Sequence, residues 1–135
     1  MRKLDDDMWV AGQIAPEEVA DLAAAGVTRI VNNRPDGEES GQPAGAEIEA
    51  AAHAAGIDYR HVPVAGGFTA DGVDAMAEAT EEPGVTLAFC KSGTRSALLW
   101  ALARAQAGDD PEELEAKASA AGYDLGPVRR FLQSH

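Results

Sequence analysis

The sequence predicts an α/β fold, in which a mainly parallel central sheet is flanked by helices in a single domain over residues 1–135. Strand-like segments alternate with helical, alanine-rich segments along the whole chain, which is the order expected of a parallel sheet covered by helices. The connections between these segments are short, and 135 residues suit one compact domain with one core.

The boundaries of the elements follow from proline, glycine and capping residues. Pro16 and Pro111 fit the first position of a helix, and Thr69 can cap another. Residues 85–89 are almost wholly apolar, which predicts a central, buried, parallel strand. The predicted strands are 8–11, 27–32, 57–62 and 85–89, and the predicted helices are 16–25, 43–55, 69–80, 95–107, 111–121 and a short one from about 127.

The charge of the chain limits its partners. A formal net charge of −12 repels phosphate backbones and anionic lipid, so we expect neither nucleic acid nor a membrane as partner. A small anionic substrate would need a local positive pocket inside this negative field. No apolar run is long enough to cross a bilayer and the first seven residues lack the apolar stretch of a signal peptide, so we expect a cytoplasmic location.

Cys90 is the only cysteine, which excludes an internal disulfide and a zinc site built from cysteines. The histidines (His53, His61 and His135) lack the spacing of metal ligands, and we predict neither a metal site nor a cofactor. A free thiol is either a small buried hydrophobe or a reactive group, and its neighbours favour the second.

Those neighbours form an anion-binding loop between the strand 85–89 and the helix expected from about Arg95. Ligands of α/β sheets bind at the carboxyl ends of strands, and a helix N-terminus offers free N–H groups and a favourable dipole. We therefore predict that Cys90 is a nucleophile of lowered pKa and that Arg95 offers a fork of donors to an oxyanion. The predicted anion-binding residues are Lys91, Ser92, Gly93, Thr94 and Ser96, with Thr94 or Ser96 able to hydrogen-bond the thiolate.

Two further candidates outside this loop are Arg34 and His61. Arg34 follows a strand and is either a second anion contact or an ion-pair partner of Asp36 or Glu38 in its own loop. Asp36 and Glu38 are expected to shape that turn. His61 is expected to be structural, hydrogen-bonded to the backbone.

The motifs resemble two known families. The Cys-x4-Arg-Ser loop is similar to the active loop of rhodanese-type sulfurtransferases. The remaining motifs resemble the phosphatase-like domain found alone or fused to β-lactamase-like hydrolases, whose members have been described as phosphatases and as sulfurtransferases. This second resemblance covers nearly the whole chain and implies a fold like that of tyrosine and dual-specificity phosphatases. Its motifs are Gly12-Gln13-Ile14, the run from Asn32 to Glu38, His61-Val62-Pro63-Val64 and Phe89 to Ser96.

Two departures from the tyrosine-phosphatase pattern favour sulfur transfer. That signature is Cys-x5-Arg, so this loop is one residue shorter, which should weaken binding of a phosphoryl transition state. The expected general-acid loop is Ala65-Gly66-Gly67-Phe68, and the nearest acid, Asp71, suits the first turn of a helix instead. A Cys90 thiolate that becomes a persulfide needs little protonation of its leaving group.

The sequence therefore leaves three functions open. The first is a sulfurtransferase that carries a Cys90 persulfide between a sulfur donor and a thiol acceptor. The second is a phosphatase that works through a Cys90 phosphocysteine. The third is a non-catalytic module, in which the loop binds an anion or the thiol senses redox state.

Overall fold

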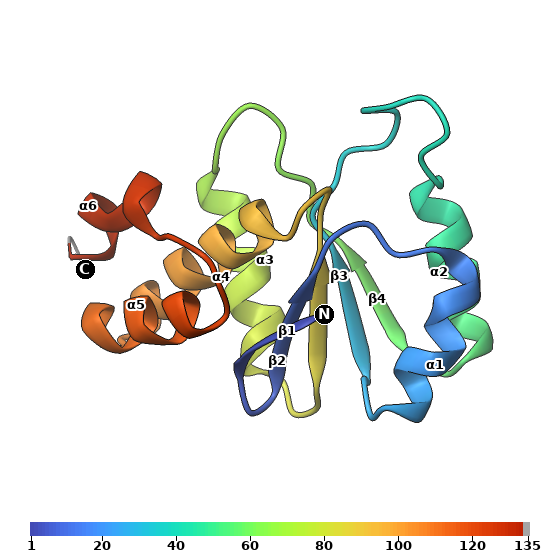
Figure 1. The fold of residues 1–135 in the computed structure, drawn as a ribbon, viewed down its shortest axis with the longest axis horizontal. Helices are drawn as coiled ribbons and strands as arrows, with labels where there is room; N and C mark the ends of the chain where they lie inside the picture. The colour runs from blue at the N-terminus through green and yellow to red at the C-terminus, as the bar shows by residue number, and fades with distance from the viewer. Residues whose placement is uncertain (134–135) are drawn as a thin grey trace.

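The centre of the molecule is a five-stranded sheet in the order β1-β2-β5-β3-β4 (Figure 1). Strands β2 (Met8–Ala11), β5 (Thr86–Phe89), β3 (Arg29–Asn32) and β4 (Asp58–His61) run parallel, as predicted. The computed structural model describes residues 1–133, so His135 lies outside the described residues. Strand β5 is the middle strand and all four of its residues are buried, which confirms the prediction for 85–89.

Helices cover both faces of this sheet. One face carries α1 (Val19–Ala24), which follows the 3-10 turn η1 (Pro16–Glu18), and α2 (Gly45–Ala54). The other face carries the remaining helices, with α3 and α4 in close contact with each other (Figure 1). They are α3 (Ala70–Glu81), α4 (Thr94–Gln106), α5 (Pro111–Ala120), the turn η2 (Gly126–Val128) and α6 (Arg129–Leu132).

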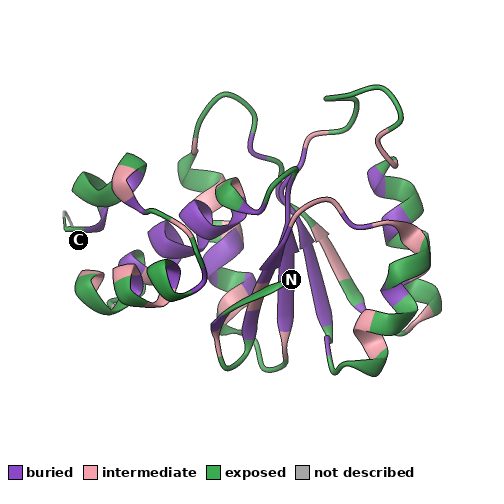
Figure 2. Cartoon of the chain, viewed as in Figure 1, coloured by how far each residue is buried: buried purple, intermediate pink, exposed green. Residues whose placement is uncertain are grey.

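Helix α4 is the most deeply buried helix, because α3, α5 and α6 all pack around it (Figure 2). Its residues from Ser96 to Ala103 are all buried. Trp100 is 1% exposed and lies among the largest core side chains. The helix that follows Cys90 is therefore held on several sides, which fixes the position of the loop before it.

The sequence missed one strand. Residues Arg2–Asp5 form β1, which pairs antiparallel with β2 at the edge of the sheet. The segment is short and mostly charged, and only Leu4 is fully buried, so it carries little apolar signal. This edge segment is a strand because it pairs with β2, not because of its own composition.

No helix among residues 1–133 is long and apolar enough to cross a membrane.

Candidate active site at the carboxyl ends of the parallel strands

Cys90 lies directly after β5, and residues 90–93 turn from this strand into α4. The Gly93 N–H donates a hydrogen bond to the Cys90 sulfur, with 3.1 Å between nitrogen and sulfur. Gly93 has a φ of +90° at the N-cap of α4, a region that favours glycine. A side chain there would also lie 2.3 Å from the Tyr123 hydroxyl, so glycine is needed for both reasons. The sequence thus places the thiol correctly at the N-terminal end of a helix.

The environment of Cys90 favours the thiolate. Burial, the largest single influence, raises the pKa of this fully buried thiol. Hydrogen bonds from the backbone of Ser96, Ser92 and Gly93 and from the Ser96 hydroxyl outweigh it and hold the pKa below its ordinary value. Ser96 Oγ is buried and makes no hydrogen bond of ordinary geometry among residues 1–133, whereas the Gly93 N–H does reach the sulfur.

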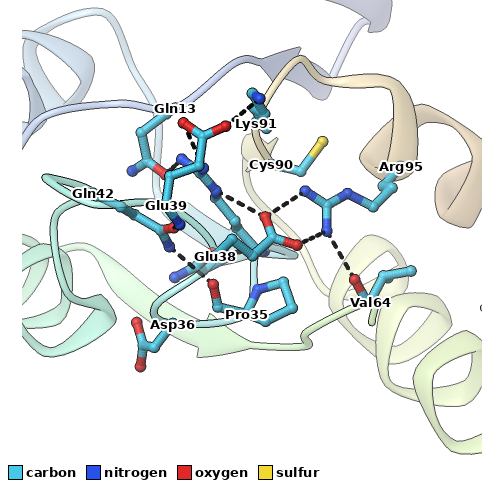
Figure 3. A network of polar contacts seen from close by, with 12 residues as sticks. Gln13, Pro35, Asp36, Glu38, Glu39, Gln42, Val64, Cys90, Lys91 and Arg95 are labelled. Atoms are coloured by element: carbon cyan, nitrogen blue, oxygen red, sulfur yellow. Dashed lines mark hydrogen bonds and ion pairs between the residues drawn. The ribbon is translucent and has the colours of Figure 1, made fainter. Parts of the chain in front are cut away.

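Arg95 leaves the first turn of α4 and contacts two other loops. Its Nη1 donates to the Val64 carbonyl oxygen at 2.9 Å, and Nη1 and Nη2 grip the Glu38 carboxylate at 2.7 and 2.8 Å (Figure 3). The pKa of Arg95 is raised, first by Glu38 and also by the nearby Cys90. The guanidinium therefore stands beside the thiol with its fork already paired to a carboxylate.

Arg34 follows β3 and reaches the same carboxylate. Its Nε donates to Glu38 at 2.9 Å, and Nη1 donates to the side-chain oxygen of Gln13 at 3.0 Å. The sequence left Asp36 and Glu38 open as partners of Arg34. The structure pairs it with Glu38 and more distantly with Glu39, while Asp36 accepts the Gly45 N–H at the start of α2.

The side chains of the other loop residues pair with groups other than the thiol. The Lys91 ammonium is mostly exposed and forms an ion pair with Glu39, while its carbonyl accepts the Gln13 N–H at 3.2 Å. Ser92 Oγ donates to Thr94 Oγ1 at 3.2 Å, and both residues are exposed. Of the two hydroxyls proposed as thiolate partners, that of Ser96 contributes to lowering the pKa of Cys90, while that of Thr94 pairs with Ser92.

Loop 65–68 carries no carboxylic acid, and Asp71 lies exposed in the first turn of α3, as the sequence predicts. Thr69 caps that helix by accepting the Gly72 N–H at 3.0 Å. His61 Nε2 lies 3.1 Å from the Arg34 carbonyl oxygen, which is the expected contact with the backbone. No group of three His, Cys, Asp or Glu side chains within residues 1–133 is placed to hold a metal ion.

The sequence did not predict two candidate functional residues, Glu38 and Tyr123. Glu38 was assigned to a turn, yet it joins Arg34, which follows β3, to Arg95 of α4. Tyr123 lies half-buried with its hydroxyl against Gly93, and burial raises its pKa. The i,i+4 spacing of Arg34 and Glu38 hinted at the first contact, but the bond to Arg95 spans 57 residues and no local signal predicts it.

Comparison with known proteins decides the family. Residues 1–107 match the model of the β-lactamase hydrolase-like protein, phosphatase-like domain. The chain belongs to this family. A β-lactamase hydrolase-like protein of Xylella fastidiosa (strain 9a5c) is 39% identical over 134 residues, and one of Agrobacterium fabrum is 36% identical. These alignments cover 96% and 97% of this chain but 31% of each relative, so the chain spans about a third of their length.

Solved structures agree with the fold of this family. A candidate phosphatase from Neisseria meningitidis Z2491 superposes with a TM-score of 0.82 at 32% identity, covering 98% of this chain and 95% of that one. The kinase-associated phosphatase, at 19% identity, superposes with a TM-score of 0.67 over 95% of this chain and 87% of that one, which shows the shared fold. The predicted tyrosine-phosphatase-like fold is confirmed.

These matches also change the ranking of functions. The family and its 32%-identical structural relative are phosphatase-like, and none of the relatives described above supports the likeness to rhodanese. The Cys-x4-Arg spacing is a fact of the sequence, but it does not by itself make the domain a sulfurtransferase. The phosphatase alternative is therefore better supported than the sulfur-transfer reading that the sequence placed first.

Proposed function

We propose that the protein is a cysteine-dependent phosphatase that hydrolyses a small, anionic phosphate ester through a Cys90 phosphocysteine. The observation that carries this proposal is the Cys90 thiol at the N-terminus of α4, hydrogen-bonded to the Gly93 N–H and beside Arg95, in a phosphatase-like family. Lowering of the thiol pKa by surrounding N–H groups and the Ser96 hydroxyl increases the share of thiolate, which is the nucleophile.

The first step transfers the phosphoryl group to sulfur. The thiolate attacks phosphorus, an S–P bond forms, the P–O ester bond breaks, and the leaving oxygen takes the electron pair. The N–H groups of the Cys90 loop and the Arg95 fork bind the phosphoryl oxygens as charge builds on them. Water then attacks phosphorus, the S–P bond breaks, inorganic phosphate leaves, and the thiolate returns.

The site lacks an acid that could protonate the leaving group of this reaction. Loop 65–68 has no acid, and the paired Glu38 has a pKa of about 2, held down first by Arg95, so it is ionised at neutral pH. An unprotonated leaving group costs roughly 10²–10⁴ in rate when it is an alkoxide, but little when it is a phenolate. We therefore expect aryl or other activated phosphates to be the better substrates.

The lack of an acid in loop 65–68 favours sulfur transfer as the second candidate function. The thiolate would attack the outer sulfur of thiosulfate, form a persulfide and expel sulfite, which leaves without protonation. A thiol acceptor would then take the outer sulfur and return the thiolate. The loop that is one residue short and the missing acid both hinder sulfur transfer less than they hinder phosphate hydrolysis.

One pair of assays separates the two. Turnover of an aryl phosphate and an alkyl phosphate is measured beside intact-mass analysis after thiosulfate treatment, each with wild type and Cys90→Ser. The proposal expects aryl turnover that Cys90→Ser abolishes. If wild type gains a sulfur adduct but turns over no phosphate ester, sulfur transfer replaces the phosphatase proposal. If wild type gives neither result, the protein is a non-catalytic module.

A further inference from the structure

Tyr123 touches the Cys90 loop from a part of the chain that the proposed reaction does not use. It lies in the connection between α5 and η2, and its half-buried side chain packs against the core that surrounds α4. A Cβ on Gly93 would lie 2.3 Å from the Tyr123 hydroxyl and 3.1 Å from the ring carbon that carries it. The ring therefore already fills the space beside the Gly93 Cα, and the fit depends on the absence of a side chain there.

Gly93 is the residue through which this contact reaches the thiol. Its N–H donates to the Cys90 sulfur at 3.1 Å, and its φ of +90° turns the chain into α4. The N–H faces the sulfur, whereas the position of a Cβ faces Tyr123. Glycine has more freedom of φ and ψ than any other residue, so a contact on its other side limits how far this N–H can turn away from the sulfur.

The segment that carries Tyr123 is itself held by β1 and α5. The Tyr123 N–H donates to the Ala118 carbonyl oxygen at 2.8 Å, and the Arg2 guanidinium donates to the Ala121 carbonyl oxygen at 3.1 Å. Leu125, two residues further on, is 2% exposed and belongs to the core. A ring on a segment that is fixed at both ends can hold a neighbouring loop in place, whereas a ring on a free loop would move with it.

The phenol also lies within the electrostatic range of the thiolate. Burial, the largest influence, raises the pKa of Tyr123; Arg2 acts against it, and the Cys90 thiolate acts with it. Tyr123 is therefore a neutral phenol at neutral pH and adds no second negative charge beside the thiolate. An aromatic ring without charge suits a support of this loop, because it fills space without opposing ionisation of the thiol.

We propose that Tyr123 is a positioning residue of the Cys90 site, which braces Gly93 on the side away from the sulfur and keeps its N–H directed at the thiolate. Tyr123 acts through Gly93 and not on the ligand. The inference deepens the proposed function, because it adds a residue to that site. It rests on the Cys90 nucleophile, which phosphate hydrolysis and sulfur transfer share.

The test reads the thiol directly and needs no substrate. Cys90 is the only cysteine, so the pH profile of its alkylation by iodoacetamide follows the fraction of thiolate. Each profile is normalised to its own plateau at high pH, which removes any change in access to the sulfur. Tyr123→Ala removes the brace, whereas Tyr123→Phe keeps the ring.

Tyr59→Ala is the matched control. Tyr59 is the other tyrosine of the chain, it is also half-buried, and burial raises its pKa as well. It lies on β4, where its hydroxyl accepts a hydrogen bond from Asn32 at 3.0 Å. Its loss removes a similar ring from the protein without touching Gly93.

Tyr123→Ala should move the normalised profile to higher pH, so that the thiolate fraction below the wild-type midpoint falls roughly threefold. Tyr123→Phe should stay within about twofold of wild type, because the ring still contacts Gly93, and Tyr59→Ala should leave the profile unchanged. An unchanged midpoint for Tyr123→Ala would overturn the proposal. So would a lower midpoint, which is the result expected of a ring that only shields the thiol from water.

A second variant guards against loss of folding. If Tyr123→Ala does not unfold cooperatively on heating, Tyr123→Leu takes its place, because leucine keeps apolar bulk in the core but is too short to reach Gly93. The same shift to higher pH is expected of Tyr123→Leu, and a wild-type profile would refute the brace. Absence of turnover on any phosphate ester, with the thiol results as expected, would instead refute only the proposed function.

Discussion

Replacement of Gly93 by alanine tests whether the Cys90 loop depends on backbone shape. At the φ of +90°, an alanine is strained relative to glycine by about 1–2 kcal/mol. Its Cβ would also lie 2.3 Å from the Tyr123 hydroxyl and 3.4 Å from the Ala11 carbonyl oxygen. The second distance is ordinary contact, so the overlap falls on Tyr123 and is relieved only if that ring moves by about 1 Å.

A double-mutant cycle separates the two costs. Gly93→Ala should lower the free energy of unfolding by about 2–3 kcal/mol, measured by urea denaturation. In a Tyr123→Phe background, which lacks the hydroxyl, the same change should cost roughly 1 kcal/mol less, because the closest overlap is gone and only the backbone strain and the ring carbon at 3.1 Å are left. The difference between the two backgrounds is the contribution of the contact between residues 93 and 123.

The thiol provides a second readout of the same change. Strain at Gly93 tilts the N–H that lies 3.1 Å from the sulfur, so the pKa of Cys90 should rise. This appears as a shift to higher pH in the profile of alkylation rate. The reasoning is refuted if Gly93→Ala leaves both the stability and this profile as in wild type.

Three further predictions concern residues around the site and the sheet. Ser96→Ala should raise the pKa of Cys90, measured by the pH profile of alkylation, whereas Thr94→Ala should not, because its hydroxyl pairs with Ser92. Arg29→Met should cost about 3 kcal/mol of stability in urea, since this 5%-exposed arginine donates to Asp58, Thr86 and two carbonyl groups; a loss below 1 kcal/mol would contradict its role. The pKa of Glu38 falls from 4.5 to about 2 in the folded protein, so its stabilisation is complete above pH 4.5 and is lost as the pH falls toward 2; acid unfolding of Glu38→Gln should be less steep, and equal slopes would argue against the ion pair.

Local patterns predicted most of the fold for clear reasons. Pro16, Thr69 and Pro111 mark helix starts through properties of their own backbone or side chain, and they mark the same starts in the structure. The apolar run before Cys90 predicted the central strand because a strand buried on both faces has no polar side. Strand β1 was missed because an edge strand needs only one buried residue and a neighbour to pair with.

The candidate site was predicted where its residues are consecutive. Cys90, Gly93, Arg95 and Ser96 share one segment that runs from the end of β5 into the first turn of α4, and a loop between a strand and a helix has few possible shapes. The role of Glu38 was not predictable in this way. Its two arginine partners lie 4 and 57 residues away in the sequence. Its ion pair with Arg95 of α4 forms only once the sheet is assembled.

The sequence by itself determined the α/β class, the position of a cysteine thiol before a helix, and the length of the Cys-x4-Arg loop, because each depends on neighbours along the chain. The tertiary structure alone decided which charges meet at that loop. Parallel strands bring their carboxyl ends to one edge, so Arg34, Glu38 and Arg95 converge there although no local pattern joins them. The candidate site at Cys90 is therefore encoded in one short segment, but its charges are completed by residues from the loop after β3.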